Sequence, residues 1–105
     1  KGREPDAEGA VIRPGALDSA TGVAGVIETA RAFKAGPAPE RTLLFGLWTG
    51  EERGLLGSEY FAETSPYAAG KMVASIAYDT LHPLGPTRDV VLIGSGQNQL
   101  EDRLK

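Results

Sequence analysis

The chain has 105 residues, 41% of them hydrophobic, which is enough to bury the core of one small domain. Its 14 acidic and 11 basic side chains leave a net charge of −3 without a basic cluster, which argues against a nucleic-acid partner. No apolar run reaches the roughly 20 residues that cross a bilayer. Because the chain has no cysteine, any metal would be held by carboxylate, imidazole or backbone oxygen.

The first third of the chain predicts an irregular start and then a helix. Residues 1–10 are mostly charged or polar and show no periodicity, and Pro14-Gly15 breaks a short extended piece at 11–16. Good N-cap residues follow, and an apolar stripe at helical spacing then leads to Ala35, after which Gly36 stops the helix. The N-cap candidates are Asp18, Ser19 and Thr21, and the stripe consists of Val23, Val26, Ile27, Ala30 and Phe33.

The middle of the chain predicts a buried strand, a polar loop and a second helix. Residues 42–49 form an almost unbroken apolar run that is too short for a typical helix, which indicates a strand buried on both faces. A polar loop at 50–54 follows, and apolar residues at helical spacing then predict a helix that ends near residue 65. The aromatic residues expected in the core are Phe33, Phe45 and Trp48.

The last third predicts two more strands and a final helix. The strands are expected at 72–78 and 89–93, and the turn Gly94-Ser95-Gly96 leads to a helix from about Asn98. The order helix, strand, helix, strand, strand, helix is typical of a layered α/β (α-β-α) fold with a mostly parallel, mixed central sheet. Both ends of the chain are expected to be cuts through a larger domain, because the start is irregular and the last residues stop within a helical pattern.

Four carboxylates are expected at the edge of this sheet where the strands end, which is where open α/β folds bind ligands. Glu51 and Glu52 directly follow the first strand, and Asp79 follows the second. Asp18 opens the first helix, whose N-terminus is expected at the same edge. Because the sequence supplies no obvious arginine partner for them, these carboxylates favour a bound divalent cation. In the adjacent pair, one glutamate can bind a metal while the other acts as general base, and Asp18 is the candidate bridge between two ions.

Each of these acids also has an ordinary structural explanation. Asp18 alone would be a helix N-cap, Glu51 and Glu52 would be first-turn acids favoured by the helix dipole, and Asp79 would end a strand in a turn. Their combination, with this spacing, favours a metal site. His82 is the single histidine of the sequence, and we interpret it as a loop residue outside the site.

Three stretches of sequence carry a resemblance to a known family: 14–23 (Pro-Gly-Ala-Leu-Asp-Ser-Ala-Thr-Gly-Val), 44–58 (Leu-Phe-Gly-Leu-Trp-Thr-Gly-Glu-Glu-Arg-Gly-Leu-Leu-Gly-Ser) and 77–80 (Ala-Tyr-Asp-Thr). They resemble the zinc aminopeptidases, the co-catalytic two-zinc peptidases of clan MH, which include bacterial leucyl aminopeptidases and glutamate carboxypeptidases. The resemblance implies that Asp18 bridges two zinc ions and that Glu51 is the general base. It further implies that Glu52 binds one zinc and Asp79 the other.

The sequence also departs from the family pattern. Ser19 stands where the family usually has asparagine, and Leu17 stands at a position that is often acidic. The two histidine ligands of the family, one upstream of residue 14 and one well downstream of Asp79, have no counterpart in the chain.

The resemblance implies that residues 1–105 are the central piece of a two-zinc peptidase catalytic domain. The expected activity is that of an exopeptidase of the aminopeptidase type, with a peptide or an amino-acid amide as substrate, and a secreted or periplasmic protein is compatible with it. Because carboxylates alone lack the usual imidazole donors, the isolated chain is expected to bind zinc weakly and to show little or no activity. It is also expected to expose apolar surface.

Two other functions are consistent with parts of the sequence. One is a non-catalytic binding domain of the same fold that has lost its metals, although the presence of all four acids argues against it. The other is nucleotide binding at the turn Gly94-Ser95-Gly96, which is a weak match because the third glycine of a dinucleotide loop is missing.

Overall fold

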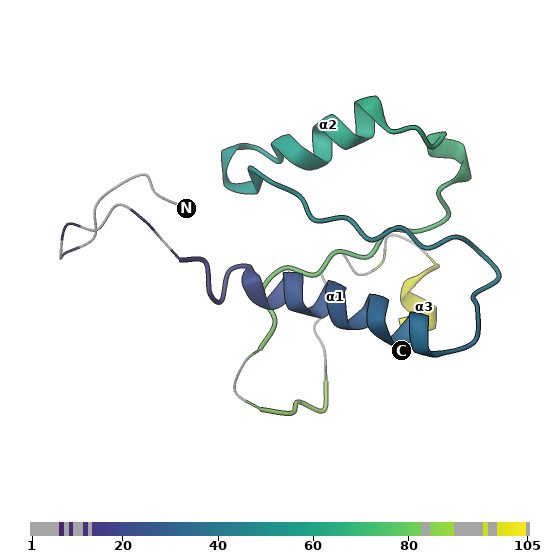
Figure 1. The fold of residues 1–105 in the computed structure, drawn as a ribbon, viewed down its shortest axis with the longest axis horizontal. Helices are drawn as coiled ribbons and strands as arrows, with labels where there is room; N and C mark the ends of the chain where they lie inside the picture. The colour runs from purple at the N-terminus through teal and green to yellow at the C-terminus, as the bar shows by residue number, and fades with distance from the viewer. Residues whose placement is uncertain are drawn as a thin grey trace.

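The regular structure of the described residues consists of helices and 3-10 turns, which are joined by long irregular segments (Figure 1). The computed structural model describes residues 7, 9, 12, 14–82, 85–89, 96 and 99–104. No helix within these residues is long and apolar enough to span a membrane. The elements are α1 (Ala20–Ala35), the 3-10 turn η1 (Glu51–Arg53), α2 (Leu56–Thr64), the 3-10 turn η2 (Ala69–Lys71) and the short helix α3 (Glu101–Leu104).

The first predicted helix is confirmed as α1. It begins after Ser19, one of the three N-cap candidates, although the Ser19 side chain makes no capping hydrogen bond. The helix ends at the predicted position, where the Gly36 N–H donates to the carbonyl oxygen of Ala32 over 3.1 Å. On its exposed side, Arg31 donates to Glu28 in a surface ion pair that contributes at most about 0.5 kcal/mol.

The second predicted helix is confirmed as α2. Its start is held against the preceding segment, because the Gly57 N–H donates to the carbonyl oxygen of Thr49 over 2.8 Å. The ring of Trp48 packs on that of Phe61, with centroids 4.8 Å apart and planes inclined by 39°. This aromatic contact fixes α2 to the segment that leads into η1.

The predicted strands are not formed in the part of the chain that the structure describes. Residues 42–49 and 72–78 are irregular there, and the described backbone hydrogen bonds include no ladder between them. A strand exists only when a neighbouring backbone satisfies its N–H and C=O groups, and these segments lack such a partner ladder. Of the third predicted strand, Asp89 is irregular and 90–93 lie outside the described residues. Asn98, the expected start of the last helix, also lies outside them. The layered α/β fold therefore stays a prediction.

The prediction that Phe33, Phe45 and Trp48 lie in the core is wrong. The structure describes no buried hydrophobic side chain, and Phe33, Phe45 and Trp48 are 46%, 42% and 49% exposed. An apolar run predicts burial only if another layer covers it, and the contact of Trp48 with Phe61 of α2 still leaves Trp48 half exposed. The expectation of exposed apolar surface is confirmed, since large apolar side chains of both irregular segments are exposed, among them Leu47 and Val73.

The size of the exposed surface agrees with this picture. The structure exposes 9472 Å², whereas a folded protein of 11.0 kDa exposes about 5,600 Å². Its radius of gyration is 16.5 Å, against about 13 Å for a compact chain of this length. The arrangement therefore removes much less surface from water than a stable small domain does.

We expect the isolated 105-residue chain to unfold without a sharp cooperative transition and to bind a hydrophobic dye such as ANS, because its apolar side chains are not buried. Urea titration followed by circular dichroism and dye fluorescence checks this. A steep, two-state transition with no dye binding would contradict it.

Candidate metal centre

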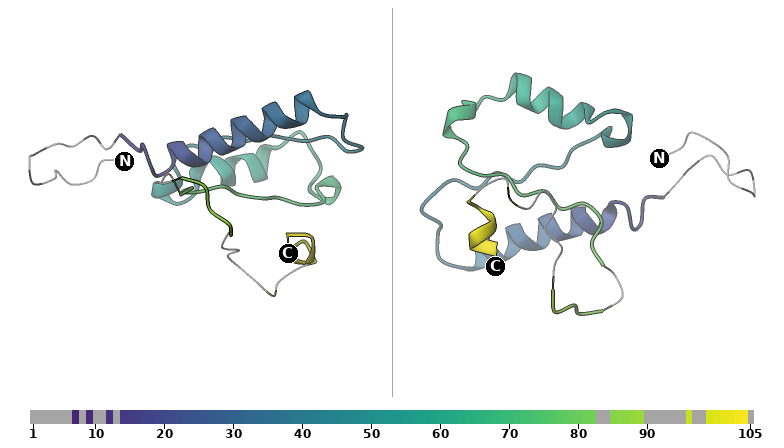
Figure 2. Two further views of the ribbon diagram at one scale, coloured as in Figure 1. Left: turned by 90° about the horizontal axis from the view of Figure 1, so that it is seen from below. Right: turned by 180° about the vertical axis from the view of Figure 1, so that it is seen from behind.

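Asp79 lies beside the N-terminal end of α1. The contact is made at Gly22, the buried residue of that helix. A Cβ atom placed on Gly22 would be 2.8 Å from the carbonyl oxygen of Tyr78 and closer still to that of Asp79, so the backbone of this segment passes directly over the glycine. Figures 1 and 2 show the segment running along α1 and crossing it near its start. Since Asp18 precedes Gly22 by about one helical turn, two of the four predicted site residues share this end of the helix.

The hydroxyl of Thr21 joins the loop before α1 to the segment after Asp79. It donates to the carbonyl oxygen of Leu17 over 2.7 Å and accepts from the N–H of Leu81 over 2.9 Å. The sequence indicates Thr21 only as an N-cap candidate. The partner 60 residues away is not visible in a local pattern, so this bond was missed.

Small residues on one face of α1 make room for the same segment. A Cβ on Gly25 would be 2.7 Å from the Leu81 side chain and 3.2 Å from the ring of Tyr78. One turn further, the Thr29 hydroxyl donates to the carbonyl oxygen of Gly25 over 2.8 Å and lies 3.4 Å from the Tyr78 hydroxyl. One face of α1 thus contacts residues 78–81 through Gly22, Gly25 and Thr29.

Glu51 and Glu52 lie on η1, a single 3-10 turn within the predicted polar loop. Gly50 and Gly54 flank the turn with φ of 70° and 101°, a left-handed conformation that glycine adopts without a steric cost. The carbonyl oxygen of Glu51 accepts from the N–H of Gly54 over 3.0 Å and from that of Leu55 over 2.9 Å. This folded turn holds the backbone of both glutamates while their side chains are exposed to solvent.

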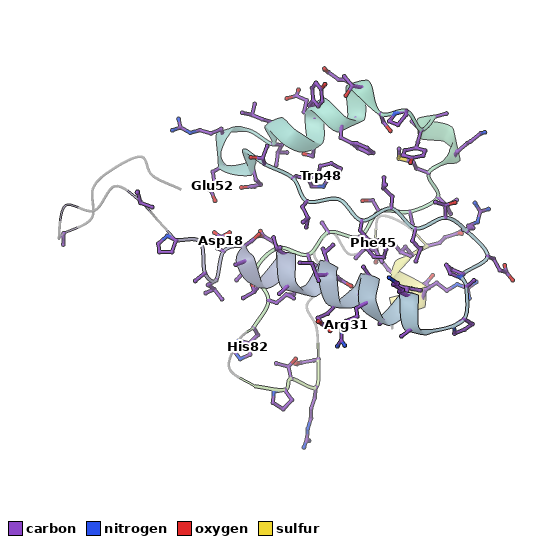
Figure 3. The ribbon with its side chains drawn as sticks, in the orientation of Figure 1. Asp18, Arg31, Phe45, Trp48, Glu52 and His82 are labelled. Atoms are coloured by element: carbon purple, nitrogen blue, oxygen red, sulfur yellow. The ribbon has the colours of Figure 1, made fainter. Side chains whose placement is uncertain are left out.

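η1 and the start of α1 lie at the same end of the molecule. Figure 3 shows Asp18 on the loop before α1 and Glu52 on η1 at this end, and Figure 2 keeps both elements there. His82 is exposed and lies on the other side of α1 from Glu52 in the view of Figure 3. Our interpretation of this histidine as a loop residue outside the site stays a prediction.

The four carboxylates do not form a closed metal site in the structure. Among the residues that it describes, no three histidine, cysteine, aspartate or glutamate side chains gather closely enough to hold a metal ion. Asp18, Glu51, Glu52 and Asp79 are all exposed. The structure brings Asp18 and Asp79 to one helix end and η1 to the same side, but it does not assemble the full donor set. The ligand roles therefore stay predictions.

Comparisons with known proteins give a family for the chain. Residues 5–105 match peptidase family M28. A probable zinc metalloprotease of Pyrenophora tritici-repentis (strain Pt-1C-BFP) is 44% identical over 66 residues, which are 63% of this chain and 15% of that protein. Leupeptin-inactivating enzyme 1 of Streptomyces exfoliatus is 46% identical over 55 residues, which are 51% of this chain and 13% of that enzyme. The matched part of the chain thus spans a small fraction of these relatives, and no solved structure matches it.

Proposed function

The chain belongs to peptidase family M28, and from this premise we propose that it is part of a zinc-dependent peptidase. The family match confirms the resemblance to zinc peptidases that the motifs indicate, and the name of the relative from Pyrenophora tritici-repentis identifies zinc as the metal of that protein. Peptides are the substrate class that the family implies.

The structural observation that most supports this proposal is the contact of residues 78–79 with Gly22. It places the backbone of Asp79 beside the first turn of α1, close along the chain to Asp18. These two acids are 61 positions apart in sequence, and a shared location is what a joint role requires. Carboxylate oxygens are ordinary zinc ligands, so the chemistry of the donors agrees with the metal.

We further propose an exopeptidase of the aminopeptidase type with a two-zinc site. The order and spacing of the three motifs support this finer assignment. Asp18 is the proposed bridge between the ions, and Glu52 and Asp79 are proposed to bind one ion each. When zinc is bound, it supplies Lewis-acid polarisation of the scissile carbonyl.

Glu51 is the proposed general base. Its carboxylate accepts a proton from the attacking water and passes it to the leaving amine. The position supports this role, because backbone hydrogen bonds hold η1 in place while the Glu51 side chain is open to solvent. Glu52 occupies the next position on the same short turn.

Chelation and zinc reconstitution of the full-length protein test the proposed activity. We expect turnover of an aminoacyl anilide to be lost on dialysis against a chelator and to return as about two zinc ions per chain are restored. Turnover that is unchanged by complete removal of metal would contradict a zinc-dependent peptidase. A protein with neither zinc nor turnover would instead support the non-catalytic binding domain.

A blocked substrate tests the exopeptidase assignment separately. We expect a peptide with a free N-terminus to be shortened from that end, and the same peptide with an acetylated N-terminus to stay intact, because an aminopeptidase needs the free amine. Mass spectrometry of the products distinguishes the two. Internal cleavage of the acetylated peptide would show an endopeptidase and would leave the zinc-dependent chemistry in place.

A further inference from the structure

Thr21 lies between the two parts of the chain that carry Asp18 and Asp79. Its side chain is half-buried at the start of α1, next to the buried Gly22. The hydroxyl acts both as a hydrogen-bond donor and as an acceptor. It donates to the carbonyl oxygen of Leu17 and accepts from the N–H of Leu81. Both distances, 2.7 and 2.9 Å, are those of well-formed hydrogen bonds.

One bond acts on the peptide unit that adjoins Asp18, and the other acts on the segment that follows Asp79. Leu17 is the residue directly before Asp18, and Leu81 is two residues after Asp79. A single hydroxyl therefore fixes the loop that carries one acid to the segment that carries the other. Gly22 permits this geometry, because its lack of a side chain lets the backbone of residues 78–79 come into contact with the helix.

We infer that Thr21 is a positioning residue that sets the spacing between Asp18 and Asp79, an inference that rests on the proposed peptidase function. The Thr21 hydroxyl is occupied by two backbone groups, so it acts through the chain segments it joins and not on the reacting atoms. Groups that orient metal ligands from outside the ligand shell typically affect metal affinity or activity by about 10- to 100-fold.

The test compares Thr21→Val, which keeps the shape but loses the hydroxyl, with Thr21→Ser, which keeps the hydroxyl, in the full-length protein. The matched control is Thr64→Val, because the Thr64 hydroxyl makes the same local bond to the Tyr60 carbonyl oxygen, 2.7 Å long, on α2. Three quantities are measured for each variant: hydrogen exchange at the Leu81 amide, zinc affinity by titration calorimetry, and kcat and KM separately.

In Thr21→Val we expect the Leu81 amide to exchange at least about fivefold faster, as the loss of one hydrogen bond implies. We expect zinc affinity and kcat to fall by about 10- to 100-fold, with KM within about twofold, because ligand spacing changes and substrate contacts do not. Thr21→Ser and Thr64→Val are expected to keep the zinc affinity and kcat of the unmodified protein. Rescue by serine separates the role of the hydroxyl from that of the methyl group.

The outcomes distinguish this inference from the proposed function. If the unmodified protein is active and zinc-dependent while Thr21→Val retains its kcat and zinc affinity, the inference alone is overturned. An equal loss in Thr21→Ser overturns it too, and this variant remains informative if Thr21→Val does not fold. An unmodified protein without zinc or turnover overturns the proposed function, and the inference with it.

Discussion

Replacement of Glu51 by glutamine is expected to lower the kcat of the full-length protein by about 10²- to 10⁴-fold. Glutamine has the shape of glutamate but cannot accept the proton of the attacking water. The backbone bonds that form η1 come from the Glu51 carbonyl oxygen and not from its side chain, so the turn is retained. Steady-state kinetics with an aminoacyl anilide provide the measurement.

The matched control for this substitution is Glu63→Gln. Glu63 is an exposed glutamate on α2, and the same chemical change there is expected to leave kcat within about twofold, as for a surface position away from the site. Zinc content is measured in parallel, since a general base can be removed without loss of metal. Full activity in Glu51→Gln would show that the base is another residue.

Replacement of Gly22 by alanine is expected to destabilise the full-length protein by about 1–3 kcal/mol. Glycine to alanine in a helix normally stabilises by about 0.5–1 kcal/mol, because it lowers the entropy of the unfolded chain. At Gly22 the sign reverses, since the added methyl group overlaps the backbone carbonyl groups of Tyr78 and Asp79. The displaced segment carries a proposed zinc ligand, so zinc affinity is expected to fall as well.

Urea denaturation and zinc titration of this variant are compared with Gly70→Ala. A Cβ on Gly70 meets no atom within 4 Å, and Gly70 lies on the short turn η2, so its replacement is expected to be nearly neutral. If Gly22→Ala is as stable as Gly70→Ala and binds zinc equally well, residues 78–79 do not lie over α1 in the folded protein.

The helices could be predicted from sequence because their signals are local. The apolar stripe and capping residues of α1, and the glycine that follows Ala35, act within a few residues of one another. The strands expected at 42–49 and 72–78 have no complete local signal, because a strand depends on partners far along the chain. Trp48 shows the difference. Its apolar neighbours predict burial, but its ring contacts α2 on one side and remains 49% exposed.

The candidate site shows the same division between local and distant information. The types and order of Asp18, Glu51, Glu52 and Asp79 could be read directly, because the motifs that contain them are continuous. What brings Asp18 and Asp79 to one end of α1 could not be read, because it depends on contacts such as that between Thr21 and Leu81, 60 residues apart. Four carboxylates on three separate segments need a structural framework that no single motif describes.

The exposed apolar segments bear on the proposed fold. In a layered α/β protein, runs such as 42–49 and 72–78 would pair with other strands and lie beneath helices. Here they are irregular and exposed, although they carry the apolar side chains that such a sheet would bury. We propose that they form adjacent strands in the folded family domain, which would bring η1 and Asp79 to one sheet edge.

The location of zinc in crystals of the full-length protein, measured by anomalous diffraction at the zinc absorption edge, tests the central claim most directly. We expect two ions roughly 3.5–4 Å apart, with a carboxylate oxygen of Asp18 on each and with Glu52 and Asp79 on one each, at about 2.0–2.2 Å. Zinc bound elsewhere, with these three carboxylates pointing away from one another, would contradict the account.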